Sequence, residues 1–244
     1  MSKKIRTEAV DYLFSAILSL KDKEECYTFF EDICTINELL SLSQRFEVAK
    51  MLREQKTYLE IAEKTGLIYR KEDGVFLAVS MNQKYEISCS DFLCGQKIDQ
   101  WFHLVLLHYM DLGDGTPVSK ELITFGEMKD GLIRGTKYDR TMVQEIKKFL
   151  KDKEPDQVKT VWKTLGAEFV SSRADLCAIF PFLPRFPLTV NVWFADDEFE
   201  ATGKMLLSQT ADRYLTVEDA VIVGDIVLNR WKEAWDDYEH QGIT

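Results

Sequence analysis

The sequence predicts an α+β protein with an N-terminal helical segment and a larger domain of packed helices on a mainly antiparallel sheet. Up to Gly66, apolar residues recur every three or four positions, which is the period of an amphipathic helix. After Gly66, short alternating runs are separated by the turn sequences KEDG and MNQK, which is typical of antiparallel strands. We therefore expect two parts, residues 1–66 and 67–244.

The helical segment contains clear helix start and stop signals. Amphipathic helices are expected from about Val10 and over residues 23–34, and the capping sequence Thr35-x-x-Glu38 opens a third helical stretch, clearest from Ser41 to Gln55. A second capping box, Thr57-x-x-Glu60, opens a short helix that ends at Gly66. A helix, a short helix and a glycine turn form the first part of a helix-turn-helix, although any small helical bundle has the same pattern.

The larger domain is expected to alternate between strands and helices. An amphipathic helix should bury Trp101, Phe102 and Tyr109 on one face, and the segment PFLPRFP should be a loop. The predicted strands are 67–70, 75–80, 85–89, 168–171, 176–180, 188–194 and 204–207, and the remaining helices are 138–151, 155–165 and 216–238.

Composition and charge narrow the class of protein. The chain has 244 residues, of which 45% are hydrophobic, and no apolar run approaches the ~20 residues needed to cross a bilayer. The five cysteines form no CxxC pair, and Cys89 and Cys94 lack further metal ligands nearby. We expect a cytoplasmic protein with reduced thiols and no membrane partner. The net charge of −10 is unfavourable for a nucleic-acid binder.

The stretch from Leu13 to Gly66 resembles the Trp-repressor-related family of small bacterial proteins. The likeness lies in the helix order, in CTINELLSLSQRFEVAKML and in TYLEIAEKTG, and it covers about a quarter of the chain. It implies a dimeric, DNA-binding transcriptional regulator in which the helices of two subunits intertwine. The candidate DNA contacts are cationic or hydroxyl side chains, namely Lys50, Arg53, Lys56, Thr57 and Lys64. The alternative is that they form an ordinary solvated helix face.

Two departures from that family change what is expected. The recognition helix that should follow Gly66 is replaced by LIYRKEDGVFLAVS, which favours a strand and a hairpin turn. The element that usually contacts base edges in the major groove, the recognition helix, is therefore not expected. Glu47 stands where the true repressor has an arginine for its corepressor, so no tryptophan corepressor is predicted.

A second resemblance covers residues 60–238. The segments LLHYMDLGDGTPVSKELITFGEM, LPRFPLTVNVWFADDEF and ADRYLTVEDAVIVGDIVL look like an uncharacterised family, domain of unknown function 3786. The likeness implies no activity. Both families fit the segment EIAEKTG, so the sequence suggests a fusion at a shared helix.

One acidic run is the candidate ligand site of the second part. Asp196, Asp197, Glu198 and Glu200 follow the clearest strand, and alternate carboxylates would share one face if the strand continued. The run is either a divalent-cation site or a solvated acidic turn. His108 is a further candidate ligand, although His103 and His108 lie about 140° apart on a helix and form no metal pair.

Three functions stay open on the sequence. The leading one is a DNA-binding regulator whose second domain senses a ligand. The second is a homodimer whose N-terminal helices serve assembly only. The third is an enzyme or a small-molecule or metal-binding domain that uses the acidic run and the space beneath PFLPRFP. No catalytic residue is assigned, and a divalent cation is the sole cofactor considered.

Overall fold

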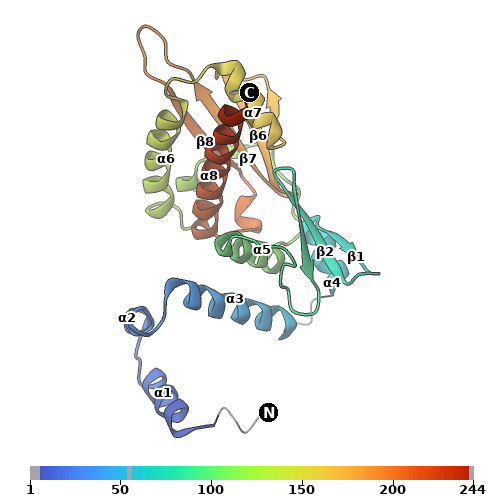
Figure 1. Ribbon diagram of the computed structural model, residues 1–244, viewed down its shortest axis with the longest axis vertical. Helices are drawn as coiled ribbons and strands as arrows, with labels where there is room; N and C mark the ends of the chain where they lie inside the picture. The colour runs from blue at the N-terminus through green and yellow to red at the C-terminus, as the bar shows by residue number, and fades with distance from the viewer. Residues whose placement is uncertain (1–5, 54–56, 242–244) are drawn as a thin grey trace. The chain divides into compact units, whose positions relative to one another are not determined.

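The computed structural model describes residues 6–53 and 57–241, without the side chains of residues 44, 47, 48 and 51–53 (Figure 1). It confirms the α+β class. The chain divides into two compact units, residues 1–45 and 46–244, so the division falls ahead of the boundary expected near Gly66. The difference arises because Ile61 belongs to the hydrophobic core of the second unit.

The first unit is helical, and its helix starts follow the capping residues in the sequence. It contains α1 (Glu8–Leu18), α2 (Lys23–Ile33) and the beginning of α3 (Ile36–Arg53). The side chains of Thr7 and Asp22 accept hydrogen bonds from backbone N–H groups in the first turns of α1 and α2. Such caps satisfy N–H donors that a helix leaves without partners.

The second unit contains two antiparallel sheets. The smaller sheet has the strand order β1-β2-β3 and the larger one the order β4-β8-β7-β6-β5. The strands are β1 (Ile68–Arg70), β2 (Val75–Ser80), β3 (Gln83–Ser88), β4 (Leu122–Ile123), β5 (Glu168–Val170), β6 (Leu176–Leu183), β7 (Phe186–Trp193) and β8 (Thr202–Ser208). The helices are α4 (Tyr58–Thr65), α5 (Gln100–Leu112), α6 (Arg134–Leu150), α7 (Pro155–Thr164) and α8 (Val217–Gln241), with short 3-10 turns η1 (Phe125–Glu127) and η2 (Ala211–Arg213).

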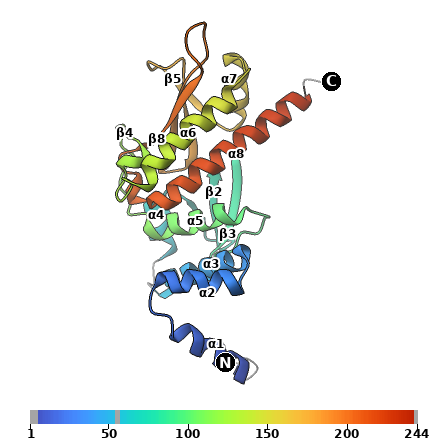
Figure 2. The ribbon, with the colours of Figure 1, turned by 90° about the vertical axis from the view of Figure 1, so that its left-hand side faces the viewer.

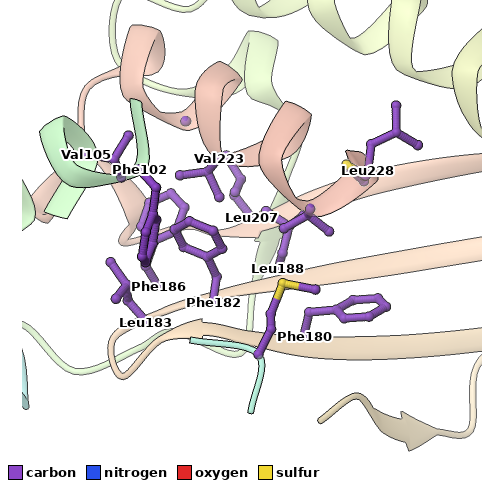
Figure 3. Packing of buried hydrophobic residues seen from close by; sticks show 14 of the residues in the cluster. Phe102, Val105, Phe180, Phe182, Leu183, Phe186, Leu188, Leu207, Val223 and Leu228 are labelled. Carbon is purple, nitrogen blue, oxygen red and sulfur yellow. The ribbon is translucent and has the colours of Figure 1, made fainter. Parts of the chain in front are cut away.

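Helices α6, α7 and α8 lie over the larger sheet (Figure 2). Leu188, Val190 and Val192 alternate inward along β7, as the sequence predicts, and all three are fully buried. Val223 and Leu228 of α8 belong to the same buried cluster as Leu188 and Leu207 of the larger sheet (Figure 3). Burial of this apolar surface is the main favourable contribution to folding of the unit.

The prediction of a loop at PFLPRFP is wrong. β6 continues to Leu183 and β7 begins at Phe186, so Pro184 and Arg185 form the turn of a tight hairpin. The pairing register shifts between Phe180 and Leu183. Proline has no backbone N–H. It is tolerated in strands at such interruptions, because the pairing needs no donor there.

Helix α5 is buried more widely than an amphipathic stripe. Phe102 through Leu107 are all buried, whereas Trp101, expected on the inner face, is 42% exposed at the start of the helix. Within residues 6–53 and 57–241, every helix falls short of the length and apolar character that crossing a bilayer demands.

Candidate functional site

The short helix α4 has the caps that its sequence predicts. The Thr57 hydroxyl accepts the backbone N–H of Glu60 at 3.2 Å, and Glu60 accepts the backbone N–H of Thr57 at 2.9 Å. The bond from the Thr57 N–H, together with one that the Thr57 hydroxyl donates to the same carboxylate, lowers the pKa of Glu60. Gly66 ends the helix in the left-handed conformation, with φ of 75°. The Thr57 hydroxyl is therefore engaged in the cap.

A strand follows α4 in place of a recognition helix. β1 begins at Ile68 and pairs with β2 from Ile68↔Leu77 to Arg70↔Val75. The Asp73-Gly74 turn between them has the positive φ at Gly74 that such turns require. The predicted interruption of the helix-turn-helix is thus confirmed.

The residues predicted to contact DNA lie in different environments. Lys64 is exposed in the last turn of α4, while the ammonium of Lys50 donates to the buried carboxylate of Asp111. Arg53 ends α3, but its side chain lies outside the described part, as does the whole of Lys56. The structure therefore brings Lys50 to an acidic partner and leaves Lys64 facing solvent.

Three sequence motifs of the second unit meet at the end of α4. They are the EIAEKTG segment, the LLHYMD segment of α5 and the LPRFP turn between β6 and β7. The buried Tyr109 hydroxyl donates to the carbonyl oxygen of Thr65 and accepts the backbone N–H of Arg185 at 3.0 Å. Burial holds the pKa of Tyr109 above its ordinary range, so the hydroxyl stays neutral. A Cβ added at Gly66 would lie 3.0 Å from the Cβ of Pro184. The β6–β7 turn therefore rests directly on Gly66 and Tyr109.

Replacing Tyr109 with phenylalanine is expected to destabilise the second unit by about 1–3 kcal/mol. The change keeps the ring but leaves the Thr65 carbonyl and the Arg185 N–H without their partner. Chemical denaturation followed by far-UV circular dichroism measures the loss. The matched control is Tyr69→Phe on β1, whose hydroxyl forms no hydrogen bond within the described residues. Equal stabilities of the Tyr109 variant and the wild type would show that the junction contributes nothing.

His108 pairs with a residue that the sequence did not nominate as a ligand. Its Nδ1 lies 2.7 Å from Oδ1 of Asp219, and Oδ2 of Asp219 accepts the backbone N–H and the hydroxyl of Thr216 at 3.1 and 2.7 Å. Asp219 is buried in the first turn of α8. The sequence identifies Thr216 and Asp219 as a helix start, but it contains no signal for the contact with α5.

The acidic run is a turn, not a continued strand. β7 ends at Trp193, and the Asp196 carboxylate accepts the backbone N–H groups of Glu198 and Phe199 at 2.9 and 2.7 Å. These two bonds lower the pKa of Asp196. Glu200 forms an ion pair with Lys147 on α6.

The condition under which Asp196, Glu198 and Glu200 would share a strand face is not met, because the extended backbone stops before them, and the run is the acidic turn that the sequence offers as the alternative. Asp197 is exposed beside them, and His108 is bonded elsewhere. Among the described residues, no group of three or more His, Cys, Asp or Glu side chains is placed to hold a metal ion.

Two family models match the chain. Residues 57–230 match the model described as Domain of unknown function (DUF3786), and residues 8–68 match the Trp repressor protein model. The two matches overlap along α4 and the start of β1. The first covers well over half of the chain and includes all three motifs that meet around Tyr109.

Individual proteins resemble the N-terminal region. The uncharacterized protein YerC of Bacillus subtilis (strain 168) is 62% identical over 63 residues, which are 26% of this chain and 61% of YerC. A TrpR like protein from Eubacterium eligens ATCC 27750, known from a crystal structure, is 74% identical over 27% of this chain and 67% of its own, with a TM-score of 0.23. This chain thus spans less than two thirds of the length of YerC. It belongs to the DUF3786 family and carries, ahead of and overlapping that domain, a Trp-repressor-like region.

Proposed function

We propose that the protein is a homodimer assembled through α1, α2 and the first part of α3, and that its second unit, not a recognition helix, carries ligand recognition. One observation supports assembly above all. α1 and α2 have no buried residue, although both contain large apolar side chains. Those at least 50% exposed in α1, α2 and the first turn of α3 are Tyr12, Phe14, Leu18, Tyr27, Ile33 and Ile36.

Exposed apolar side chains on this scale need a covering surface. Leu18 is 86% and Tyr12 80% exposed, and burying such a side chain stabilises an assembly by about 1.5–3 kcal/mol. Large exposed apolar side chains concentrated in one region are typical of protein interfaces. A second copy is the partner that we propose, because the same region matches the Trp repressor protein family. A self-complementary patch on two identical chains forms a closed dimer.

The oligomeric state of the full chain tests the assembly. We expect light scattering after size-exclusion chromatography to give twice the monomer mass of 28.3 kDa across the micromolar range. A stable monomer at the highest of these concentrations would overturn the proposal.

DNA binding is the second candidate function, and the match of residues 8–68 favours it. α4 retains its complete cap, and Lys64 is exposed on it. Because β1 replaces the recognition helix, we propose contacts to phosphate without base-specific readout.

We expect weak binding to random-sequence DNA that falls by roughly one to two orders of magnitude between about 50 and 200 mM salt, as a few phosphate contacts predict. Fluorescence anisotropy with a labelled duplex measures it. Lys64→Glu should weaken binding, whereas Lys163→Glu, the same charge change on α7, should not. Undetectable binding at low salt would contradict this second function and leave the dimer proposal intact.

A further inference from the structure

Helices α7 and α8 and the β2–β3 hairpin of the second unit enclose a cavity of about 260 Å³. Its wall contains a buried arginine, two carboxylates, a tyrosine and apolar side chains of α7. Ligand sites combine a mostly apolar wall with a few charged groups that fix orientation. The volume is just below the roughly 300–1,000 Å³ typical of small-molecule sites, so a small ligand fits it.

Arg230 of α8 places a positive charge in this wall. The residue is 9% exposed, its Nη1 donates to the carbonyl oxygen and hydroxyl of Ser80 at 3.2 and 2.9 Å, and its Nη2 donates to the Tyr85 hydroxyl at 3.0 Å. These bonds account for at most three of the five N–H donors of a guanidinium. Donors therefore remain for a bound group.

Aromatic rings pack around the Arg230 guanidinium. The guanidinium carbon lies 5.0 Å from the centre of the Phe102 ring and 5.9 Å from that of Phe182, and these two rings meet edge to face (Figure 3). Ring faces stabilise a cation without neutralising it. In the described part of the chain, no carboxylate forms an ion pair with Arg230. Glu233 and Asp99 act on the Arg230 charge electrostatically, without an ion pair.

Glu233 and Asp237 supply negative charge to the same wall. They follow Arg230 by three and seven positions on α8, a spacing that puts all three side chains along one helix face. Both carboxylates are exposed, whereas Arg230 is buried. With one cation and two carboxylates, the cavity disfavours a simple anion and suits a molecule that carries both signs.

Apolar groups complete the wall. Val161 of α7 and Leu165, the residue after α7, are buried, and Ala234 lies one residue beyond Glu233. A ligand with a short apolar side chain would cover them. We propose that this cavity binds a free α-amino acid with an apolar side chain, its carboxylate on Arg230 and its ammonium on Glu233 and Asp237.

This inference rests on the proposal that the second unit carries ligand recognition, but it does not depend on dimerisation. Isothermal titration calorimetry of the full chain with L-leucine, L-valine and L-methionine, each to about 10 mM, tests it, since weak sites have millimolar Kd values. The controls are 3-methylbutylamine, which lacks the carboxylate of leucine, and 4-methylpentanoate, which lacks its ammonium. We expect at least one amino acid to bind and both single-charge analogues to bind at least about tenfold more weakly, because each leaves charged groups unpaired.

Variants on α8 separate the site from general effects of charge. The double substitution Glu233→Gln and Asp237→Asn should weaken amino-acid binding at least about tenfold. Asp236→Asn is the matched control, since Asp236 neighbours Asp237 but lines a different cavity. Because Glu233 and Asp237 are exposed, these substitutions leave the core packing intact, whereas Arg230→Lys would disturb it. The inference is overturned if no amino acid binds, if the carboxylate alone binds equally well, or if the double variant keeps the wild-type affinity. A dimer that fails to bind amino acids would refute this site and leave the assembly proposal standing.

Discussion

Replacing Phe14 with glutamate is expected to convert the proposed dimer into a monomer at micromolar concentration. Phe14 and Leu18 lie four residues apart and therefore on one face of α1, where they are 53% and 86% exposed in the single chain. In an apolar interface the new carboxylate would lose its hydration without gaining a partner. A loss of about 3 kcal/mol corresponds to a rise in the dimer Kd of more than 100-fold. Sedimentation velocity across a concentration series measures the change.

The matched control adds the same charge one position away. Ser15 is exposed, lies about 100° around the helix from Phe14, and donates its hydroxyl to the carbonyl oxygen of Asp11. Ser15→Glu should leave the dimer Kd within a fewfold of the wild-type value. A Phe14→Glu variant that dimerises as tightly as the wild type would place the interface elsewhere.

Trp231→Ala should cost the second unit about 3–5 kcal/mol, the range for truncating a fully buried large aromatic side chain. Trp231 is 0% exposed, and its ring centre lies 4.7 Å from that of Trp162 and 5.3 Å from that of Phe180. The alanine would leave a cavity between α8 and the larger sheet. Guanidinium denaturation followed by circular dichroism measures the free energy of unfolding.

A second substitution at the same position distinguishes the contribution of ring packing from that of the indole N–H. The Nε1–H of Trp231 is buried without an acceptor in the described part of the protein. Trp231→Phe keeps most of the ring contacts and removes this unsatisfied donor, so it should cost less than half as much as the alanine. If both variants lost equal stability, the cavity explanation would be wrong.

The parts of the fold that follow local rules could be predicted from sequence. The Thr57 and Glu60 cap, the Gly66 stop and the β2 strand depend on residues within a few positions of one another. The hairpin at Pro184 and Arg185 could not be predicted in this way. Three prolines within seven residues suggest a loop, and only pairing of β6 with β7, buried under α8, turns the segment into strands.

For the candidate sites, too, local features could be predicted from the sequence and long-range contacts could not. Lys64 and the acidic turn at Asp196 could be named because charge clusters are visible in the sequence. The pair of His108 and Asp219 joins positions 111 apart, and Arg230 meets Ser80 across 150 positions. A single arginine on a helix that also carries several acidic residues is no signal of a site until the fold supplies its surroundings.

Because both family matches include α4, this helix determines where the chain can be cut into fragments. A fragment that starts at Thr57 keeps the complete cap of α4 and the whole stretch matched by the DUF3786 model. A fragment that starts after Gly66 loses Ile61 and Thr65, which are buried, together with the carbonyl that Tyr109 bonds. Conversely, a fragment that ends at Gly66 exposes Ile61 to solvent. α4 is thus matched by both family models and packs in the core of the second unit, so a cut at Gly66 removes from the second unit a helix that its fold requires.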